Sequence, residues 1–319
     1  MLTAFHIKRY TPELASVWDN LIDESVNGSF ILKRSFMDYH QDRFEDFSYL
    51  IWGHKKVIAA FVAGMPRKRL NDQTLTAHPG LTYGGLIITD NLKYSLLEEI
   101  YNALLDNFKN NNIINILITP TPIVFCGKKS DDNIFYFYKN EFVLVNRELN
   151  SVIDLSQSNK LSSRQKNNLR KARKNNVKIE LSRCFHSFWE ILTDNLLQVH
   201  GVKPVHTLAE IEYLVEKNPE NIALYIAKIE NRIVAGVVVF KDINKGYLHS
   251  QYISTTAEGR LVGAVDAIFF HLIQTARADY QRFSFGISTV KGEINYGLLG
   301  YKEGFGASAE VVDTYLKSI

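Results

Sequence analysis

Two stretches decide the fold: YLIWGHKKVIAAFV, from Tyr49 to Val62, and YIAKIENRIVAGVV, from Tyr225 to Val238. They match without a gap, and in both an apolar run reaches a short polar turn and returns as a β-branched run. This pattern is typical of a β-hairpin, in which two half-buried strands flank a tight polar loop. The chain therefore contains one predicted hairpin twice.

A second repeat follows each hairpin. The sequence YKNEF at Tyr138–Phe142 is answered by YKEGF at Tyr301–Phe305. Two similarly ordered halves of roughly 150 residues indicate a tandem duplication of one domain-sized unit. We expect domains at 1–155 and 156–319, joined near Asp154–Asn159, where polar residues cluster.

Each half combines strands and helices, so each is predicted to be α/β or α+β. In the first half we expect strands at Phe5–Arg9, Leu81–Thr89 and Ile113–Thr119, and helices after Thr11-Pro12 and at Leu92–Asn107. In the second half we expect helices at Phe188–Gln198, Leu208–Lys217 and Val262–Ala276, and strands at Tyr247–Ser254, Arg282–Gly286 and Val311–Leu316. These assignments rest on apolar periodicity and on cap and turn residues.

Composition excludes disordered and membrane-spanning classes. Of the 319 residues, 46% are hydrophobic and 22% are charged, and no apolar stretch approaches the roughly 20 residues of a membrane helix. Cys126 and Cys184 have no metal-ligand spacing and make no disulfide framework. We therefore expect a cytoplasmic protein without a metal site. The net charge of +3 is small, so any attraction to polyanions must come from local patches.

The two halves differ most in the turn after the long central strand. The second half has Thr255–Ala264, with two glycines and one arginine, directly before an amphipathic helix. A glycine-containing loop at a helix N-terminus offers backbone N–H groups and the positive end of the helix dipole to a diphosphate. The first half has Thr89–Ser95 there, without glycine and with an acidic residue. Only the second half is predicted to hold phosphates; the alternative is that its glycines merely shape a turn.

The order of hairpin, strand, Gly/Arg loop and helix resembles the acyl-CoA-binding half of a GNAT-type acyltransferase. Arg260-Leu-Val-Gly263-Ala-Val265 fits two of the three fixed positions of the family's loop, Gln/Arg-x-x-Gly-x-Gly/Ala, and departs at Val265. Two consecutive units resemble the FemAB-like group of double-domain transferases. The endings Phe283-Ser-Phe-Gly286 and Tyr301-Lys302-Glu-Gly-Phe305-Gly306 are similar to that group's closing pattern.

This resemblance implies two tandem GNAT-like domains, each a mixed, mostly antiparallel sheet flanked by helices, with acyl-CoA bound by the second and the acceptor by the first. Some members of the group use aminoacyl-tRNA to extend peptidoglycan precursors, and others use acyl-CoA to acylate amino sugars. The segment Leu224–Gln251 and the sequence after it look closest to N-acyltransferases of nucleotide-linked, dTDP-type amino-deoxy sugars, which serve surface polysaccharide synthesis.

The resemblance also implies a set of binding residues. In GNAT-like folds two neighbouring strands splay apart and the thioester lies along the free edge of one, for which Val237-Val238-Val239-Phe240 is the matching run. Its N–H groups would hold pantetheine and polarise the carbonyl. The residues expected to contact the coenzyme phosphates are Gly259, Arg260, Leu261, Val262, Gly263 and Ala264.

The candidate catalytic residues are His249, Gln251 and Asp266. His249 is the first candidate for a base because histidine titrates near the working pH. Gln251 lies two residues on, on the same strand face, and is expected to hold a sugar hydroxyl. The candidate acceptor-binding residues are Lys33, Tyr83, His200, His206, Tyr252 and Lys302. For Lys302 the alternative is a surface lysine, because Lys139 occupies the same slot in the first half. For Tyr83 it is a strand bulge.

One basic segment leaves three interpretations open. Arg164–Lys174 carries six positive charges and no acid. It can contact a tRNA acceptor stem, clamp a pyrophosphate, or form a solvated helix. An aminoacyl-tRNA-dependent transferase of the FemAB type is therefore the principal alternative to the acyl-CoA-dependent enzyme. A non-catalytic adaptor is the alternative from another class. No nucleic-acid partner is expected except under the tRNA alternative.

Overall fold

The computed structural model describes residues 5–40, 42–77 and 79–319, without the side chains of residues 69–71 and 200. The chain divides into two compact units: Met1–Glu148 with Val311–Ile319, and Leu149–Glu310. Both divisions fall inside long strands, β9 (Val143–Asp154) and β17 (Ser308–Ser318). This differs from the predicted division at 155/156, and the last nine residues join the first unit. A strand that continues from one unit into the next carries no compositional signal of a linker.

Unit 1 contains an antiparallel sheet in the order β1-β3-β4-β7. Its strands are β1 (His6–Arg9), β3 (Tyr49–Trp52), β4 (Val57–Val62) and β7 (Gly85–Ile88). The predicted first hairpin is confirmed as β3 and β4, whose register places Tyr49 opposite Phe61. The other strands, in the order β17-β8-β6-β5-β2, are β8 (Asn115–Ile118), β6 (Thr74–Thr76), β5 (Gly64–Pro66) and β2 (Phe44–Asp46).

The helices of unit 1 are α1 (Ala15–Glu24), α2 (Arg34–Met37), α3 (Tyr94–Asn110) and α4 (Asp132–Lys139). Short 3-10 helices occupy Pro12–Leu14, Phe30–Leu32, Asp38–His40, Arg67–Asp72 and Ile123–Phe125. The long helix α3 packs one apolar stripe, which includes Leu97, Ile100 and Leu104, into the unit's core. Burying each of these side chains contributes about 2 kcal/mol, so the predicted 3.6-residue pattern anchors the helix.

Unit 2 contains a sheet in the order β10-β11-β12-β13-β14-β9. Its remaining strands are β10 (Lys178–Ser182), β11 (Ile222–Ile229), β12 (Arg232–Asp242), β13 (Tyr247–Thr255), β14 (Arg282–Ile287), and the separate hairpin of β15 (Thr289–Val290) and β16 (Glu293–Ile294). The predicted second hairpin is confirmed as β11 and β12. All pairings are antiparallel except that of β13 with β14.

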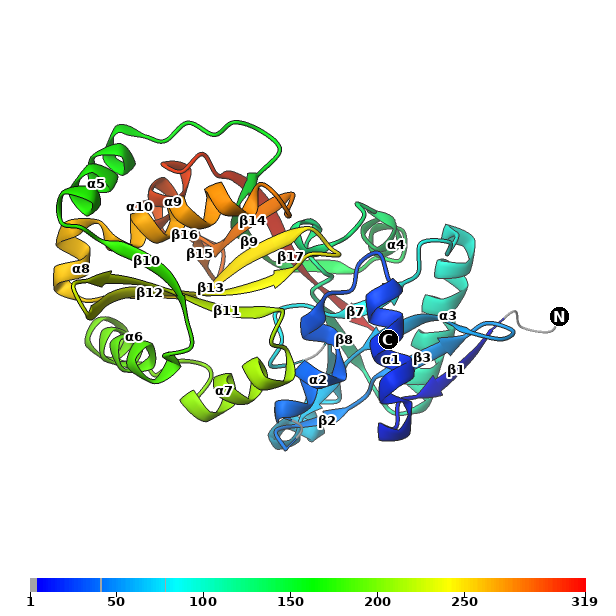
Figure 1. Cartoon of the computed structure of the whole chain (residues 1–319). Helices are drawn as coiled ribbons and strands as arrows, with labels where there is room; N and C mark the ends of the chain where they lie inside the picture. Colours follow the sequence, from blue (N-terminus) through cyan, green and yellow to red (C-terminus); the bar gives the residue numbers. More distant parts are fainter. Residues whose placement is uncertain (1–4, 41, 78) are drawn as a thin grey trace. The chain divides into compact units, whose positions relative to one another are not determined.

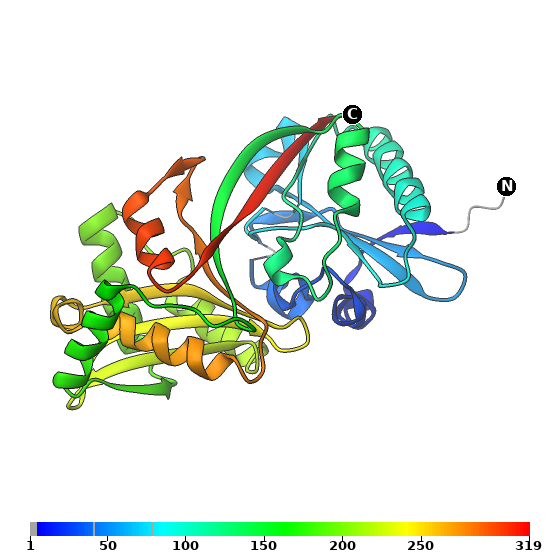
Figure 2. The same cartoon turned by 90° about the horizontal axis from the view of Figure 1, so that it is seen from above.

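The helices of unit 2 are α5 (Ser163–Lys174), α6 (Phe185–His200), α7 (Leu208–Lys217), α8 (Ala257–Val262), α9 (Ala264–Ala276) and α10 (Tyr296–Glu303). Figure 1 shows α5 and α9 on one face of the sheet and α6 and α7 on the other. In Figure 2, α5 and α9 lie side by side. The apolar core includes an aromatic group formed by Phe269, Phe283, Phe285 and Phe305.

The fold is therefore a mixed α/β architecture with mostly antiparallel sheets flanked by helices, as predicted. Among other elements, the sequence analysis missed β9 and α10, and it assigned the residues of α8 to an open loop in front of α9. Gly263 separates those two helices because its left-handed backbone (φ 75°) ends α8. Within the described residues, no helix combines the length and the apolar character needed to cross a membrane.

Candidate functional site

The central feature of unit 2 is the point where β13 and β14 separate. Their parallel pairing runs from Tyr247 opposite Arg282 to His249 opposite Ser284 and ends there. On its other side β13 continues to pair with β12 as far as Thr255. Among the described residues, β13 therefore pairs with another strand on one side only beyond His249. Gln251 is the extra residue of a β-bulge, because Val238 pairs with Tyr252 and Val239 with Ser250.

The predicted free edge was assigned to the wrong strand. Val237, Val238 and Val239 lie in β12, which is paired along both sides. Val238, for example, faces Leu224 of β11 and Tyr252 of β13. A strand between two partners has no edge to offer a ligand, so the edge that the splayed-strand mechanism requires belongs to β13.

His249 lies at this separation point in a hydrogen-bonded cluster. Its Nδ1 is 3.0 Å from the Ser284 hydroxyl, which donates to Asn150 Oδ1 at 3.1 Å. Gln251 also forms a side-chain hydrogen bond with His249. Burial, and to a smaller extent the nearby charge of Lys302, lower the pKa of His249 from 6.5 to about 4. The imidazole is therefore neutral at pH 7.

Lys302 lies in α10 and is only 3% exposed. Its ammonium donates to the carbonyl oxygens of Gly286, at 2.8 Å, and Ile287, at 2.6 Å. Burial lowers its pKa from 10.5 to about 8. The alternative of a surface lysine is therefore wrong for Lys302 and correct for Lys139, which is 52% exposed and ion-paired with Glu98 at 2.6 Å.

Two further candidate residues, Tyr252 of β13 and His206 of the loop between α6 and α7, form a separate pair. His206 Nδ1 is hydrogen-bonded to the Tyr252 hydroxyl, and both side chains are buried. Trp189 packs edge-on against Tyr252 and donates to the backbone oxygen of His206 at 3.2 Å. The side chain of His200, the last residue of α6, lies outside the described part of the chain.

The expected phosphate loop is not an open loop. The residues from Ala257 to Val262 form α8, capped by Thr256. The N–H groups of Gly259 and Arg260 bond to Thr256, at 3.1 and 3.0 Å, and that of Gly263 to the Arg260 carbonyl at 3.4 Å. Arg260 and Leu261 are exposed, whereas Val262, Gly263 and Ala264 are buried. The N-terminus of α9 remains the one place in this segment where a helix start can meet an anion.

Helix α5 covers that helix start. A Cβ atom at Gly263 would lie 2.7 Å from the backbone oxygen of Asn168 in α5. The Asn168 side chain donates to Asp266 in the first turn of α9 at 3.2 Å. Burial raises the pKa of Asp266. Asp266 therefore belongs to the α5–α9 contact, and its side chain interacts with Asn168 and Tyr301.

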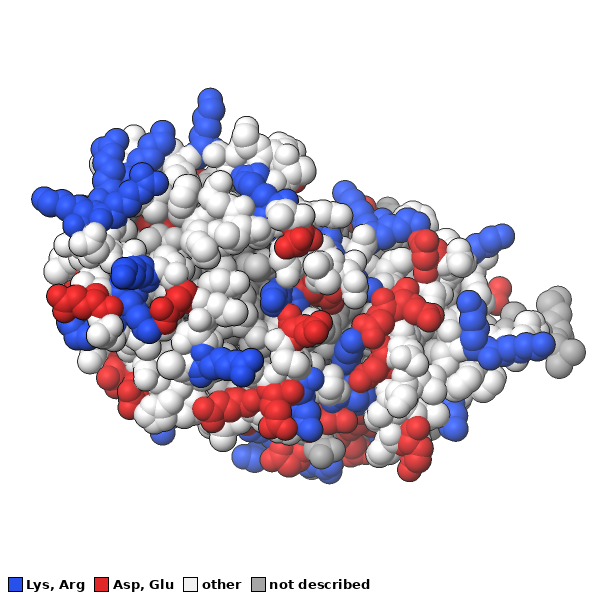
Figure 3. Space-filling model, in the orientation of Figure 1, with Lys and Arg blue, Asp and Glu red and all other residues white. Residues whose placement is uncertain are grey.

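The outward side of α5 is strongly basic. Gln165 and Ala172 are buried, and all six cations of the segment are exposed: Arg164, Lys166, Arg170, Lys171, Arg173 and Lys174. Figure 3 shows Lys and Arg gathered at the upper left of the molecule, where Figure 1 places α5. The basic segment singled out in the sequence therefore forms an exposed basic surface on a helix.

The candidate residues of unit 1 have partners within that unit. Lys33 forms an ion pair with Asp23 at 2.6 Å. Tyr83 is 3% exposed, stacks on Phe125 with 5.2 Å between ring centroids, and shares a 2.6 Å hydrogen bond with Ser29. A buried ring that is stacked on Phe125 has no free face to offer a ligand, which argues against Tyr83 as an acceptor-binding residue.

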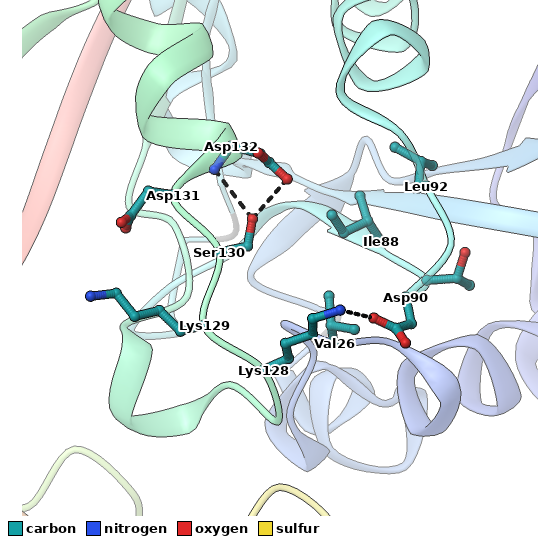
Figure 4. A pocket seen from close by; sticks show the side chains of 10 residues that line it. Val26, Ile88, Asp90, Leu92, Lys128, Lys129, Ser130, Asp131 and Asp132 are labelled. Atoms are coloured by element: carbon teal, nitrogen blue, oxygen red, sulfur yellow. Dashed lines mark hydrogen bonds and ion pairs between the residues drawn. The ribbon is translucent and has the colours of Figure 1, made fainter.

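Unit 1 also has a polar pocket between the end of β7, the segment that leads to α3 and the segment that leads to α4 (Figure 4). Lys128 is ion-paired with Asp90 at 2.6 Å, and Ser130 donates to Asp132 at 2.8 Å. None of the predicted site residues lines it. Among the described residues, no group of three or more His, Cys, Asp or Glu is placed to hold a metal ion.

The sequence analysis missed Ser284 and Asn150 as parts of the site. Ser284 stands between Phe283 and Phe285, and a single hydroxyl in a buried aromatic strand was a signal that could have found it. Asn150 had no comparable signal, because β9 was not predicted and its pairing with β14 links distant parts of the sequence.

No family model and no curated protein matches this chain. Solved structures similar to it include FemX, with 11% identity and a TM-score of 0.70 over 98% of this chain and 97% of FemX. L-PGS from Bacillus licheniformis has 13% identity and a TM-score of 0.59 over 98% and 92% of the two chains. A tandem GNAT protein from the clavulanic acid biosynthesis pathway has 6% identity and a TM-score of 0.57 over 98% of each. The chain therefore shares the overall fold of these proteins, a tandem GNAT fold.

Proposed function

We propose that this protein is an N-acyltransferase, which moves an acyl group from acyl-CoA to the amino group of a nucleotide-linked, dTDP-type amino-deoxy sugar. The observation that carries acyl transfer is the one-sided edge of β13 beside His249 and Gln251. Such an edge can pair with the amide groups of an extended donor and present N–H groups to its carbonyl oxygen. An acyl-CoA donor and a role in surface polysaccharide synthesis assign the reaction to the cytoplasm.

The reaction joins the amine nitrogen to the thioester carbon. As the N–C bond forms, the carbonyl oxygen becomes an oxyanion, and the C–S bond then breaks. The amine loses one proton, the departing sulfur gains one, and the products are an amide and a free thiol. A sugar amine is less basic than lysine, so its positioning contributes much of the rate.

His249 and Lys302 are assigned different roles: His249 transfers the proton, and Lys302 stabilises the oxyanion. Neutral His249 offers one ring nitrogen as an acceptor for the amine proton, and its low pKa favours passing the proton on to the departing thiolate. Lys302 supplies a buried positive charge close to His249. Such a charge stabilises the oxyanion more strongly in a buried site than in water. Gln251 is assigned to an acceptor hydroxyl.

Arg260 is the residue of the phosphate-loop pattern that best fits a coenzyme. Its side chain is exposed on α8, and a guanidinium binds phosphate oxygens in a bidentate manner. Because α5 covers the start of α9, a diphosphate at that helix start requires α5 to move away. We therefore expect coenzyme binding to increase hydrogen exchange in Ser163–Lys174.

The first experiment is calorimetry of CoA and acetyl-CoA with the wild type, Arg260→Glu, and Arg183→Glu as an exposed arginine outside the loop. Saturable micromolar binding that Arg260→Glu loses and Arg183→Glu keeps would support the coenzyme donor. A free-thiol assay with dTDP-amino sugars then tests the acceptor. No binding at millimolar CoA would overturn the proposal of an acyl-CoA donor.

The second candidate is an aminoacyl-tRNA-dependent transferase acting on a peptidoglycan precursor. Two observations favour it: the covered start of α9, and the exposed cations of α5, which suit a phosphate backbone. The similarity to FemX and L-PGS supports the same candidate. Charged tRNA should then support turnover, and Arg170→Glu with Arg173→Glu should abolish it. Turnover that is unchanged by this double substitution would count against it.

A further inference from the structure

The hydroxyl of Ser284 has all of its hydrogen-bonding capacity assigned. A serine hydroxyl donates one hydrogen bond and accepts two. Ser284 donates to Asn150 Oδ1 at 3.1 Å and accepts from the N–H of Gly286 at 3.2 Å. The remaining contact is His249 Nδ1 at 3.0 Å. Because its only proton goes to Asn150, the hydroxyl must accept from His249.

Asn150 is held firmly enough to impose this direction. It is 2% exposed on β9, and its strand pairs with β14 so that Asn150 faces Ile287 and Val152 faces Ser284. Ser284 itself is fully buried. If Ser284 turned its proton toward His249, the Asn150 oxygen would lose this donor in the interior, which is unfavourable because a buried acceptor would be left without it.

Gly286 completes the arrangement. Its φ of 79° is accessible to glycine and strained for other residues, and it brings the Gly286 N–H back to Ser284. The same residue offers its carbonyl to Lys302 at 2.8 Å. The C-terminal end of β14 therefore contacts both the serine and the buried ammonium, beside the histidine.

We propose that Asn150 and Ser284 are positioning residues that hold His249 in the tautomer with hydrogen on Nδ1, which makes Nε2 the ring nitrogen that can accept a proton. The catalytic part rests on the proposed function, whereas the tautomer is a property of the protein alone. A histidine in the opposite tautomer would present an N–H where the amine proton must go, and it could not act as the base.

The tautomer can be observed directly. In protein labelled with 15N-histidine, long-range proton–nitrogen correlation at pH 7 distinguishes the two neutral forms, and His249→Gln assigns the signal. We expect the Nδ1–H form in the wild type. Finding the Nε2–H form there would overturn the proposal, whatever reaction the protein catalyses.

Substitutions separate positioning from stability. In Asn150→Leu the proton of the Ser284 hydroxyl loses its acceptor and should turn to His249, so the Nε2–H form should appear. Ser284→Ala should lose the preference for the Nδ1–H tautomer. Asn150→Asp and Ser284→Thr keep the acceptor and the hydroxyl and should retain the wild-type form. Ser151→Ala is the matched control, since this buried neighbour bonds to Ser288 at 3.0 Å instead.

Turnover is measured on the same variants. Asn150→Leu and Ser284→Ala should lower kcat by about 100-fold, at the lower end of a general base's contribution, with little change in KM. The conservative variants should recover it. A switched tautomer with unchanged kcat would overturn the positioning role. A wild type without acyl transfer would refute the proposed function while the tautomer result still stands.

Discussion

The ammonium of Lys302 lies 2.8 Å from the carbonyl oxygen of Gly286 and is held in the interior of unit 2. The equivalent residue of the repeated Tyr-Lys-x-x-Phe sequence, Lys139, lies on the surface of unit 1 beside Glu98. The same five-residue pattern thus places one lysine in a buried site and the other in solvent. This difference makes Lys139 a control for Lys302.

We predict that Lys302→Met lowers acyl-transfer turnover by about 100-fold, because the developing oxyanion loses a preorganised positive charge. Lys139→Met should change turnover less than twofold, since an exposed ion pair contributes little. Steady-state kinetics on both variants checks this. Equal effects of the two substitutions would contradict a special role for Lys302.

Lys302 should also make stability depend on pH in the alkaline range. Its pKa is about 8 in the folded protein and 10.5 when unperturbed, so the unfolded chain holds more protons between these values. Folding stability should therefore rise from pH 8 to 10.5, by up to about 3 kcal/mol from this residue. Urea unfolding of the wild type and of Lys302→Met measures this rise in the free energy of unfolding with pH, and the rise should be absent from the variant. A variant curve parallel to the wild type would show that the lysine is not desolvated.

His249 should act in the acidic range. Its pKa is about 4 in the folded protein against 6.5 unperturbed, so the unfolded chain binds more protons between these values and stability falls as pH drops from 6.5 to 4. His249→Gln should flatten this part of the unfolding profile. His54→Gln, an exposed histidine in the β3–β4 turn, is the control. An equal slope in the wild type and His249→Gln would mean that His249 is solvated.

Two glycines test the contact between α5 and α9. Gly263 and Gly201 both have a left-handed backbone, with φ of 75° and 66°. Alanine at Gly201 meets no atom within 4 Å, so it should cost only the backbone strain of about 1–2 kcal/mol. Alanine at Gly263 also meets the Asn168 backbone and should cost clearly more. Thermal unfolding compares them, and equal losses would argue against tight packing of α5 on α9.

The sequence predicted the elements whose causes are local. Both hairpins formed because period-two patterning and a polar turn act over neighbouring residues. The helix Leu208–Lys217 was predicted with its observed bounds, since Thr207 and Glu210 form a capping box at its start. His249 and Gln251 were predicted to share a strand face, but Gln251 is the extra residue of a β-bulge, which interrupts the two-residue alternation between them.

Tertiary structure decided what depends on distant segments. The free edge belongs to β13 and not to the more apolar β12. Strand β12 is covered by β11, whereas β13 loses its partner β14 after His249, and the sequence of neither strand alone encodes these neighbours. Lys302 and Lys139 share one motif, and only packing buried the first. The contacts among Asn150, Ser284 and His249 join three strands. Local sequence fixes periodicity and turns through adjacent residues, whereas desolvation and strand neighbours arise only when remote segments pack together.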